Sequence, residues 1–201
     1  LAAFYAERAA AGVGLIVTGG ISPNAQGVVY QGGSILAEQE HITHHRMVTR
    51  AVHAAGGKIA LQILHAGRYS YQPNPVAPSA LQAPINRFTP HALTEEEIDT
   101  TLKDFARCAL LAKESGYDGV EIMGSEGYLI NQFLAARTNQ RTDRWGGSAE
   151  NRMRFATEAV RRVREACGLE FIIIYRLSML DLVEEGSDWQ EVEMLAQRIE
   201  Q

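Results

Sequence analysis

The sequence predicts an α/β fold, and within that class a (β/α)8 TIM barrel of which the 201 residues form an incomplete, N-terminal-half segment. Three observations favour this fold. Short apolar runs alternate with stretches of helical period, which is typical of parallel strands joined by helices. No G-x-G-x-x-G turn follows the first apolar run, although a doubly wound sheet normally shows one there. Polar side chains gather directly after the apolar runs, where a barrel carries its chemistry.

The N-terminal part of the chain contains two of the expected strands. Residues 1–11 have a helical pattern, and the apolar run over 14–18 follows them as a buried strand. A helix is expected over 43–55, with Met47 on its buried face, and it leads into a second strand over 58–64.

A third strand follows a long interruption. The residues over 65–93 are polar and rich in proline, so we expect a loop. Thr94 then begins a helix, because its hydroxyl can bond a free amide three residues on while Glu97 reaches back. The strand over 118–123 comes next, and a second long loop follows it.

The C-terminal part contains the fourth strand. Ser148 begins a helix that ends at Gly168, and the strand over 171–175 ends in Arg176. Asp188 is expected to cap a final helix. Four strands cannot close a barrel. We therefore expect the chain to supply roughly strands 2 to 5 with their helices, and the other strands to lie outside it.

Composition excludes several classes of protein. The formal net charge is −5, from 24 acidic and 19 basic residues, and no basic stripe is visible. Nucleic acid and anionic membranes are therefore not expected as partners. Cys108 and Cys167 form no disulfide framework, and neither a signal peptide nor a spanning segment is visible. These features favour a reducing, cytoplasmic location.

Two polar side chains are notable in the expected strands, one inside a strand and one at a strand end. Gln62 interrupts an apolar strand, and its donor and acceptor suit the edge of a heterocycle with alternating C=O and N–H groups. The alternative is a core glutamine bonded to a neighbouring loop. Arg176 would direct a permanent charge into the mouth of a barrel, where it can stabilise an anion on a cofactor. Its alternative is a structural ion pair with Glu121 or Asp181.

A tyrosine follows the third strand. Tyr128 is a plausible proton donor, because a phenol is neutral at pH 7 and can be oriented by a hydrogen bond; the alternative is a packing tyrosine. Glu126 would orient the phenol or a substrate, unless it is a solvated loop acid. Gly127 is expected to leave room for a substrate to approach closely.

The sequence gives little support for a metal site. His41, His44 and His45 have a spacing that can bring ligands together on a helix. No carboxylate or cysteine constellation accompanies them, so an ordinary helix start is favoured and no metal is expected.

A resemblance to a known family rests first on residues 129–155, which read L-I-N-Q-F-L-A-A-R-T-N-Q-R-T-D-R-W-G-G-S-A-E-N-R-M-R-F. This run resembles the signature of the old yellow enzyme family. The order of three further features is also similar to that of the family. They are Gln62 on one strand, Gly-Tyr at 127–128 after the next strand, and Arg176 after the third. The resemblance covers essentially the whole chain.

The branch of the family is indicated by one departure. Typical members carry a His or Asn pair that holds a substrate carbonyl, and this chain has Met123 and Glu126 there instead. That difference agrees with the bacterial 2,4-dienoyl-CoA reductase branch. Further similarity to that branch lies in the runs over 61–73, 78–88 and 172–186.

The resemblance implies cofactors and roles. Residues 1–201 would be a partial FMN-binding barrel domain, and the full protein would also carry FAD and a 4Fe-4S cluster and take electrons from NADPH. The substrate would be an acyl-CoA thioester. By similarity, the FMN contacts would be Gly20, Gln62 and Arg176, and the proton donor would be Tyr128. The residues along the substrate path would be Glu126, Arg137, Thr138, Asn139 and Gln140.

Two alternatives stay open. A relative of the same family acting on another enoate, enone or amine would share most of these motifs. A non-catalytic barrel that holds an acyl-CoA would share the fold, although it would have no need of Gln62, Tyr128 and Arg176 together.

Overall fold

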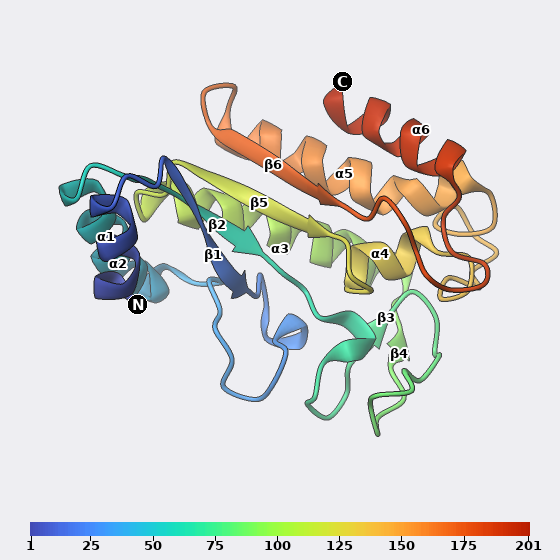
Figure 1. Cartoon of the computed structure of the whole chain (residues 1–201). Helices are drawn as coiled ribbons and strands as arrows, with labels where there is room; N and C mark the ends of the chain where they lie inside the picture. The colour runs from blue at the N-terminus through green and yellow to red at the C-terminus, as the bar shows by residue number, and fades with distance from the viewer.

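The computed structural model describes residues 1–201 and contains one parallel sheet of four strands (Figure 1). The sheet order is β1-β2-β5-β6, so each main strand lies beside the next main strand along the chain. This is the order of a β/α barrel, and the predicted fold class is confirmed. The strands are β1 (Leu15–Ile21), β2 (Lys58–Ile63), β5 (Gly119–Gly124) and β6 (Ile172–Leu177).

Helices separate the strands and cover one face of the sheet. In Figure 1, α3 and α5 lie side by side behind the strands, and α6 lies over the end of the molecule that contains β6. The core between sheet and helices is apolar; Phe155 stacks on Phe133 and meets Phe105 edge-on. The longer helices are α1 (Ala2–Ala10), α2 (Ile42–Ala54), α3 (Glu95–Glu114), α5 (Ala149–Cys167) and α6 (Trp189–Glu200). None of them has the length and apolar character that crossing a membrane requires.

The predicted helix starts are confirmed. Thr94 Oγ1 accepts the Glu97 amide at 3.2 Å, and the Glu97 carboxylate accepts the Thr94 amide at 2.8 Å, which is the reciprocal capping box. Ser148 and Asp188 cap α5 and α6 through their side-chain oxygens. Gly168 ends α5 with a φ of 79°, a conformation that glycine adopts without a side-chain clash.

The loops after the strands contain short elements. The 65–93 segment includes the two-residue parallel pair β3 (Val76–Ala77) and β4 (His91–Ala92). The second loop contains α4 (Leu129–Leu134), which the sequence did not predict. Every residue of α4 is buried, so the segment lacks the alternation of polar and apolar faces by which a helix is recognised. Three single 3-10 turns lie at Ala25–Gly27, Gln39–His41 and Gly67–Tyr69.

Two predictions were wrong in detail. The first strand does not end at Thr18 but continues through Gly19 and Gly20. Its pairing with β2 contains a register shift after Val17. At that shift the Gln62 backbone amide donates to Thr18 Oγ1 in place of a backbone carbonyl. Met47 is 63% exposed, not buried. Thr49 takes the buried position on α2, because its hydroxyl reaches the Ser115 carbonyl at 2.7 Å.

Candidate active site at the carboxyl ends of the strands

The strand register aligns the site residues in a row. Gly20 on β1 lies beside Gln62 on β2, which lies beside Glu121 on β5 and, beyond it, Ile174 on β6. Arg176 lies two residues further along β6, opposite Met123. The three residues predicted to contact a cofactor therefore lie on three strands of the same sheet, toward the carboxyl ends of those strands.

The Gln62 side-chain amide has a hydrogen-bond partner at its NH2 end but none at its oxygen. The side chain is 8% exposed, and its Nε2 donates to Glu121 Oε1 at 2.6 Å. No protein donor bonds Gln62 Oε1, so the amide keeps a free acceptor. Sequence reasoning named Glu121 only as a possible partner of Arg176. The pairing with Gln62 depends on strand register, which no local pattern reveals.

Arg176 pairs with Glu126, not with either of the acids considered from the sequence. Its Nε and Nη2 both lie 3.0 Å from Glu126 Oε1, and both side chains are about half exposed. Asp181 instead accepts the Ser187 amide at 3.1 Å. Glu126 has a φ of 63°, a left-handed conformation that costs a non-glycine residue about 1–3 kcal/mol and that often occurs at functional sites.

Tyr128 lies at the N-cap of α4 and packs on a small apolar cluster of Leu64, Ala66 and Met123. Partial burial raises the pKa of its phenol above the ordinary value, and the nearby Glu126 carboxylate raises it further. The hydroxyl therefore keeps its proton at neutral pH, as a general acid must.

A second tyrosine occupies the space beside this phenol. The rings of Tyr69 and Tyr128 meet edge-on, with centroids 6.2 Å apart. A Cβ placed on Gly127 would lie 2.6 Å from Tyr69 Cε2. The space expected to admit a substrate at Gly127 is thus filled by Tyr69, a contact that no local sequence pattern indicates.

The predicted substrate loop divides into two kinds of residue. Arg137 and Gln140 are exposed, and only their backbone amides are engaged, by Glu185 and Ser79. Thr138 and Asn139 turn inward: the Thr138 hydroxyl donates to the Gln132 carbonyl, and Asn139 Nδ2 donates to the Phe133 and Trp145 carbonyls. The structure shows these last two shaping the loop.

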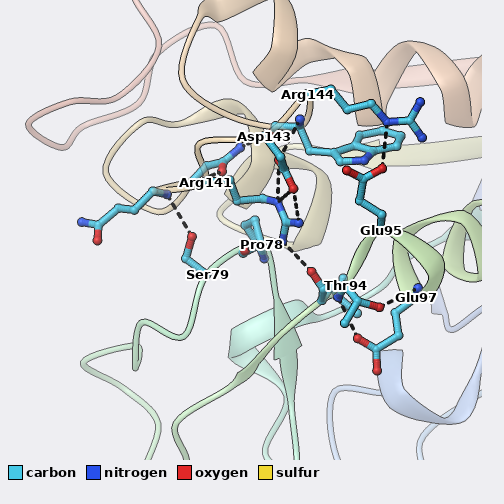
Figure 2. A network of polar contacts seen from close by, with 12 residues as sticks. Pro78, Ser79, Thr94, Glu95, Glu97, Arg141, Asp143 and Arg144 are labelled. Atoms are coloured by element: carbon cyan, nitrogen blue, oxygen red, sulfur yellow. Dashed lines mark hydrogen bonds and ion pairs between the residues drawn. The ribbon is translucent and has the colours of Figure 1, made fainter.

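An arginine that sequence reasoning passed over ties this loop to the β3–β4 segment, as Figure 2 shows. The Arg141 guanidinium holds the Asp143 carboxylate through two nitrogens. It also donates to the carbonyls of Pro78, at 3.0 Å, and Leu93. Nearby, Arg144 forms an exposed ion pair with Glu95 at 3.2 Å.

The histidines near α2 have structural partners. His41 Nδ1 accepts the Ala37 and Glu38 amides, and His45 Nδ1 lies 2.9 Å from the Tyr117 hydroxyl. No group of three or more His, Cys, Asp or Glu side chains in residues 1–201 is arranged to hold a metal ion.

The parallel β/α segment has a buried amide (Gln62), a cation (Arg176) and a phenol (Tyr128) toward the carboxyl ends of its strands. These features define a β/α-barrel protein whose site lies at that end of the strands. The particular family follows from comparison. The chain belongs to the NADH:flavin oxidoreductase / NADH oxidase family, whose sequence pattern matches residues 1–201. The resemblance to old yellow enzymes is thereby confirmed.

Similar proteins have several activities. A "metal reductase" of Desulforamulus reducens is 42% identical over 202 residues, which cover 98% of this chain and 30% of the relative. An N,N-dimethylglycine/sarcosine dehydrogenase of Chromohalobacter salexigens is 36% identical, over 96% of this chain and 29% of the relative. A 2-naphthoyl-CoA reductase structure with 2-naphthoyl-CoA has a TM-score of 0.93 and 33% identity, over 98% of this chain and 32% of the other. The chain spans about a third of the length of these proteins.

Proposed function

We propose that residues 1–201 form the part of a flavin-binding barrel, roughly strands 2 to 5, of an enzyme that uses NADPH to reduce 2,4-dienoyl-CoA thioesters in the β-oxidation of unsaturated fatty acids. The observation that carries the proposal is the placement of Gln62 on β2, Arg176 on β6 and Tyr128 in the loop after β5, toward the carboxyl ends of three neighbouring strands. Family membership supports the flavin chemistry, and the structural likeness to a reductase of an aromatic acyl-CoA supports a thioester substrate.

The residues present fit a flavin. The free Gln62 Oε1 matches the imide N–H of the ring, and Arg176 supplies a cation for the negative charge that the ring gains on reduction. Gly20 lies next to Gln62 in the strand register, and a Cβ there would lie 2.7 Å from Leu64 Cδ1, so only its backbone is available to a flavin. The phosphate of FMN would be held by strands outside the chain, as barrels of this type hold phosphate after strands seven and eight.

The chain's own residues supply the proton. When bound, reduced flavin supplies a hydride equivalent to the conjugated acceptor. The substrate is left as a dienolate, which must gain a proton at carbon. Tyr128 can donate that proton, because a phenol is protonated at neutral pH and this one lies in the loop after β5, at the N-cap of α4. Exposed Arg137 and Gln140 are proposed to line the substrate path, with Glu126, Thr138 and Asn139 beside them.

The remaining parts of the proposal rest on resemblance to the dienoyl-CoA reductase branch. FAD and a 4Fe-4S cluster would lie outside residues 1–201, which match 30% of the length of the Desulforamulus reducens relative. A cytoplasmic location is supported by Cys108 and Cys167, which are both buried and unpaired.

One relative favours a second candidate. The similarity to N,N-dimethylglycine/sarcosine dehydrogenase raises oxidation of a secondary or tertiary amine as the alternative reaction. An amine substrate gives up a hydride and needs no proton at carbon, so a protonated Tyr128 fits ene reduction better.

The test is direct. Purified full-length protein should show flavin absorbance that NADPH bleaches under anaerobic conditions. Subsequent additions of 2,4-dienoyl-CoA, cyclohexenone and a metal salt identify the acceptor, while sarcosine added to oxidised protein tests the amine alternative. Recovery of absorbance with the dienoyl thioester supports the proposal. Colourless protein, or bleaching by sarcosine alone, would refute it.

A further inference from the structure

Glu121 is a buried carboxylate that the chemistry above does not use. It is 7% exposed and lies beside Gln62 in the strand register. The Gln62 amide is its only hydrogen-bond partner, and no Lys, Arg or His forms an ion pair with it. A buried carboxylate without a cation is destabilising relative to an apolar side chain. Its presence therefore favours a role in arranging the site over a role in stability.

The contact between Gln62 and Glu121 determines the orientation of the Gln62 side-chain amide. A free glutamine amide can rotate by 180°, exchanging its donor and acceptor ends. In the structure the NH2 end faces Glu121, because Nε2 donates to the Glu121 carboxylate. Adjacent parallel strands hold the two side chains next to each other, at the observed Nε2 to Oε1 distance of 2.6 Å. Gln62 Oε1 is consequently directed away from Glu121.

We propose that Glu121 is a positioning residue, which fixes the Gln62 amide with its oxygen toward the imide N–H of the bound flavin. The inference rests on the proposed function, because it takes Gln62 as a flavin contact. Glu121 acts through Gln62 and touches neither flavin nor substrate. Without Glu121, Gln62 is free to present its NH2 group, which matches the carbonyls of the ring but not its N–H.

A double-mutant cycle on full-length protein tests this coupling. We compare FMN dissociation constants for wild type, Glu121→Leu, Gln62→Leu and the double variant, from the quenching of FMN fluorescence. One hydrogen bond is worth about 1 kcal/mol net. Glu121→Leu should therefore weaken FMN binding about fivefold in the wild-type background and have no effect when Gln62 is already Leu. Equal losses in both backgrounds, or unchanged affinity, would overturn the proposal.

A spectroscopic signal separates positioning from a general loss of packing. FMN labelled with 15N reports the hydrogen bond at N3 through that nitrogen's chemical shift. Glu121→Leu should move the N3 signal, whereas Glu165→Gln, on the distant α5 helix, should not. If Glu121→Leu does not fold, the cycle is repeated with Glu121→Gln, which keeps the volume and should show a smaller loss that also vanishes without Gln62.

The outcomes also separate this inference from the proposed function. Wild-type protein that binds no flavin would overturn both. Suppose instead that wild-type protein binds FMN tightly, that the N3 chemical shift is the same in Glu121→Leu, and that the losses of FMN affinity in the cycle are additive. That result would overturn the positioning role of Glu121 alone.

Discussion

Glu126 Oε1 lies 3.0 Å from both Nε and Nη2 of Arg176, so the cation proposed for the flavin already has an anionic partner. Glu126 lies in the loop after β5 and Arg176 lies on β6. The backbone of Glu126 has a left-handed conformation there. The carboxylate therefore reduces the positive charge that a flavin at this edge would experience.

Removing the Glu126 charge should make the flavin easier to reduce. A half-exposed ion pair is worth about 1 kcal/mol at most, which for a two-electron couple is about 20 mV. We expect Glu126→Gln to raise the flavin midpoint potential by up to about this amount, measured by spectroelectrochemistry. Glu165→Gln is the matched control, because its carboxylate pairs with Arg161 on α5. A lower potential in Glu126→Gln would contradict this account of the pair.

His65 should make the protein sensitive to acid. Complete burial lowers the pKa of its imidazole to about 3, and Nδ1 accepts the Gly67 amide at 3.1 Å. Because the unfolded chain binds this proton at the ordinary pKa of 6.5, the stability that the neutral ring contributes is present above pH 6.5 and is lost as the pH falls toward 3.

The measurement is the free energy of unfolding in urea at several pH values between 7 and about 4. His65→Asn keeps an acceptor for the Gly67 amide but does not titrate, so its stability should fall less steeply with pH than that of wild type. Parallel curves for the two proteins would show that His65 does not carry this dependence.

Arg141 should contribute more to stability than its neighbour Arg144. The Arg141 side chain is 12% exposed and links Asp143 to two carbonyls of the β3–β4 segment, whereas the ion pair of Arg144 with Glu95 is exposed (Figure 2). We expect Arg141→Ala to cost about 3 kcal/mol and Arg144→Ala at most about 1 kcal/mol, measured by urea unfolding. Equal losses would contradict the importance assigned to the Arg141 network.

Local patterns predicted most of the fold. The four main strands (apart from the end of β1), the caps at Thr94, Ser148 and Asp188 and the end of α5 at Gly168 follow from a few neighbouring residues each, and the structure contains them. Helix α4 was missed because it is buried on all sides and so has no polar face.

The site was predicted as a set of residues but not as a set of contacts. Gln62 and Glu121 are 59 positions apart, and Glu126 and Arg176 are 50 apart. Which side chains meet across such distances depends on strand register and loop path. For the same reason Tyr69, which fills the space over Gly127, could not be found from the sequence.

The most direct test of the account is the oxidative half-reaction of Tyr128→Phe. The substitution removes one oxygen and little volume, so the fold should survive. A positioned acid is worth about 10²–10⁴-fold in rate. In stopped-flow experiments on full-length protein, reduction by NADPH should stay near the wild-type rate, while reoxidation by 2,4-dienoyl-CoA should slow at least about tenfold. Reoxidation of Tyr128→Phe at the wild-type rate would contradict the assignment of Tyr128 as the proton donor.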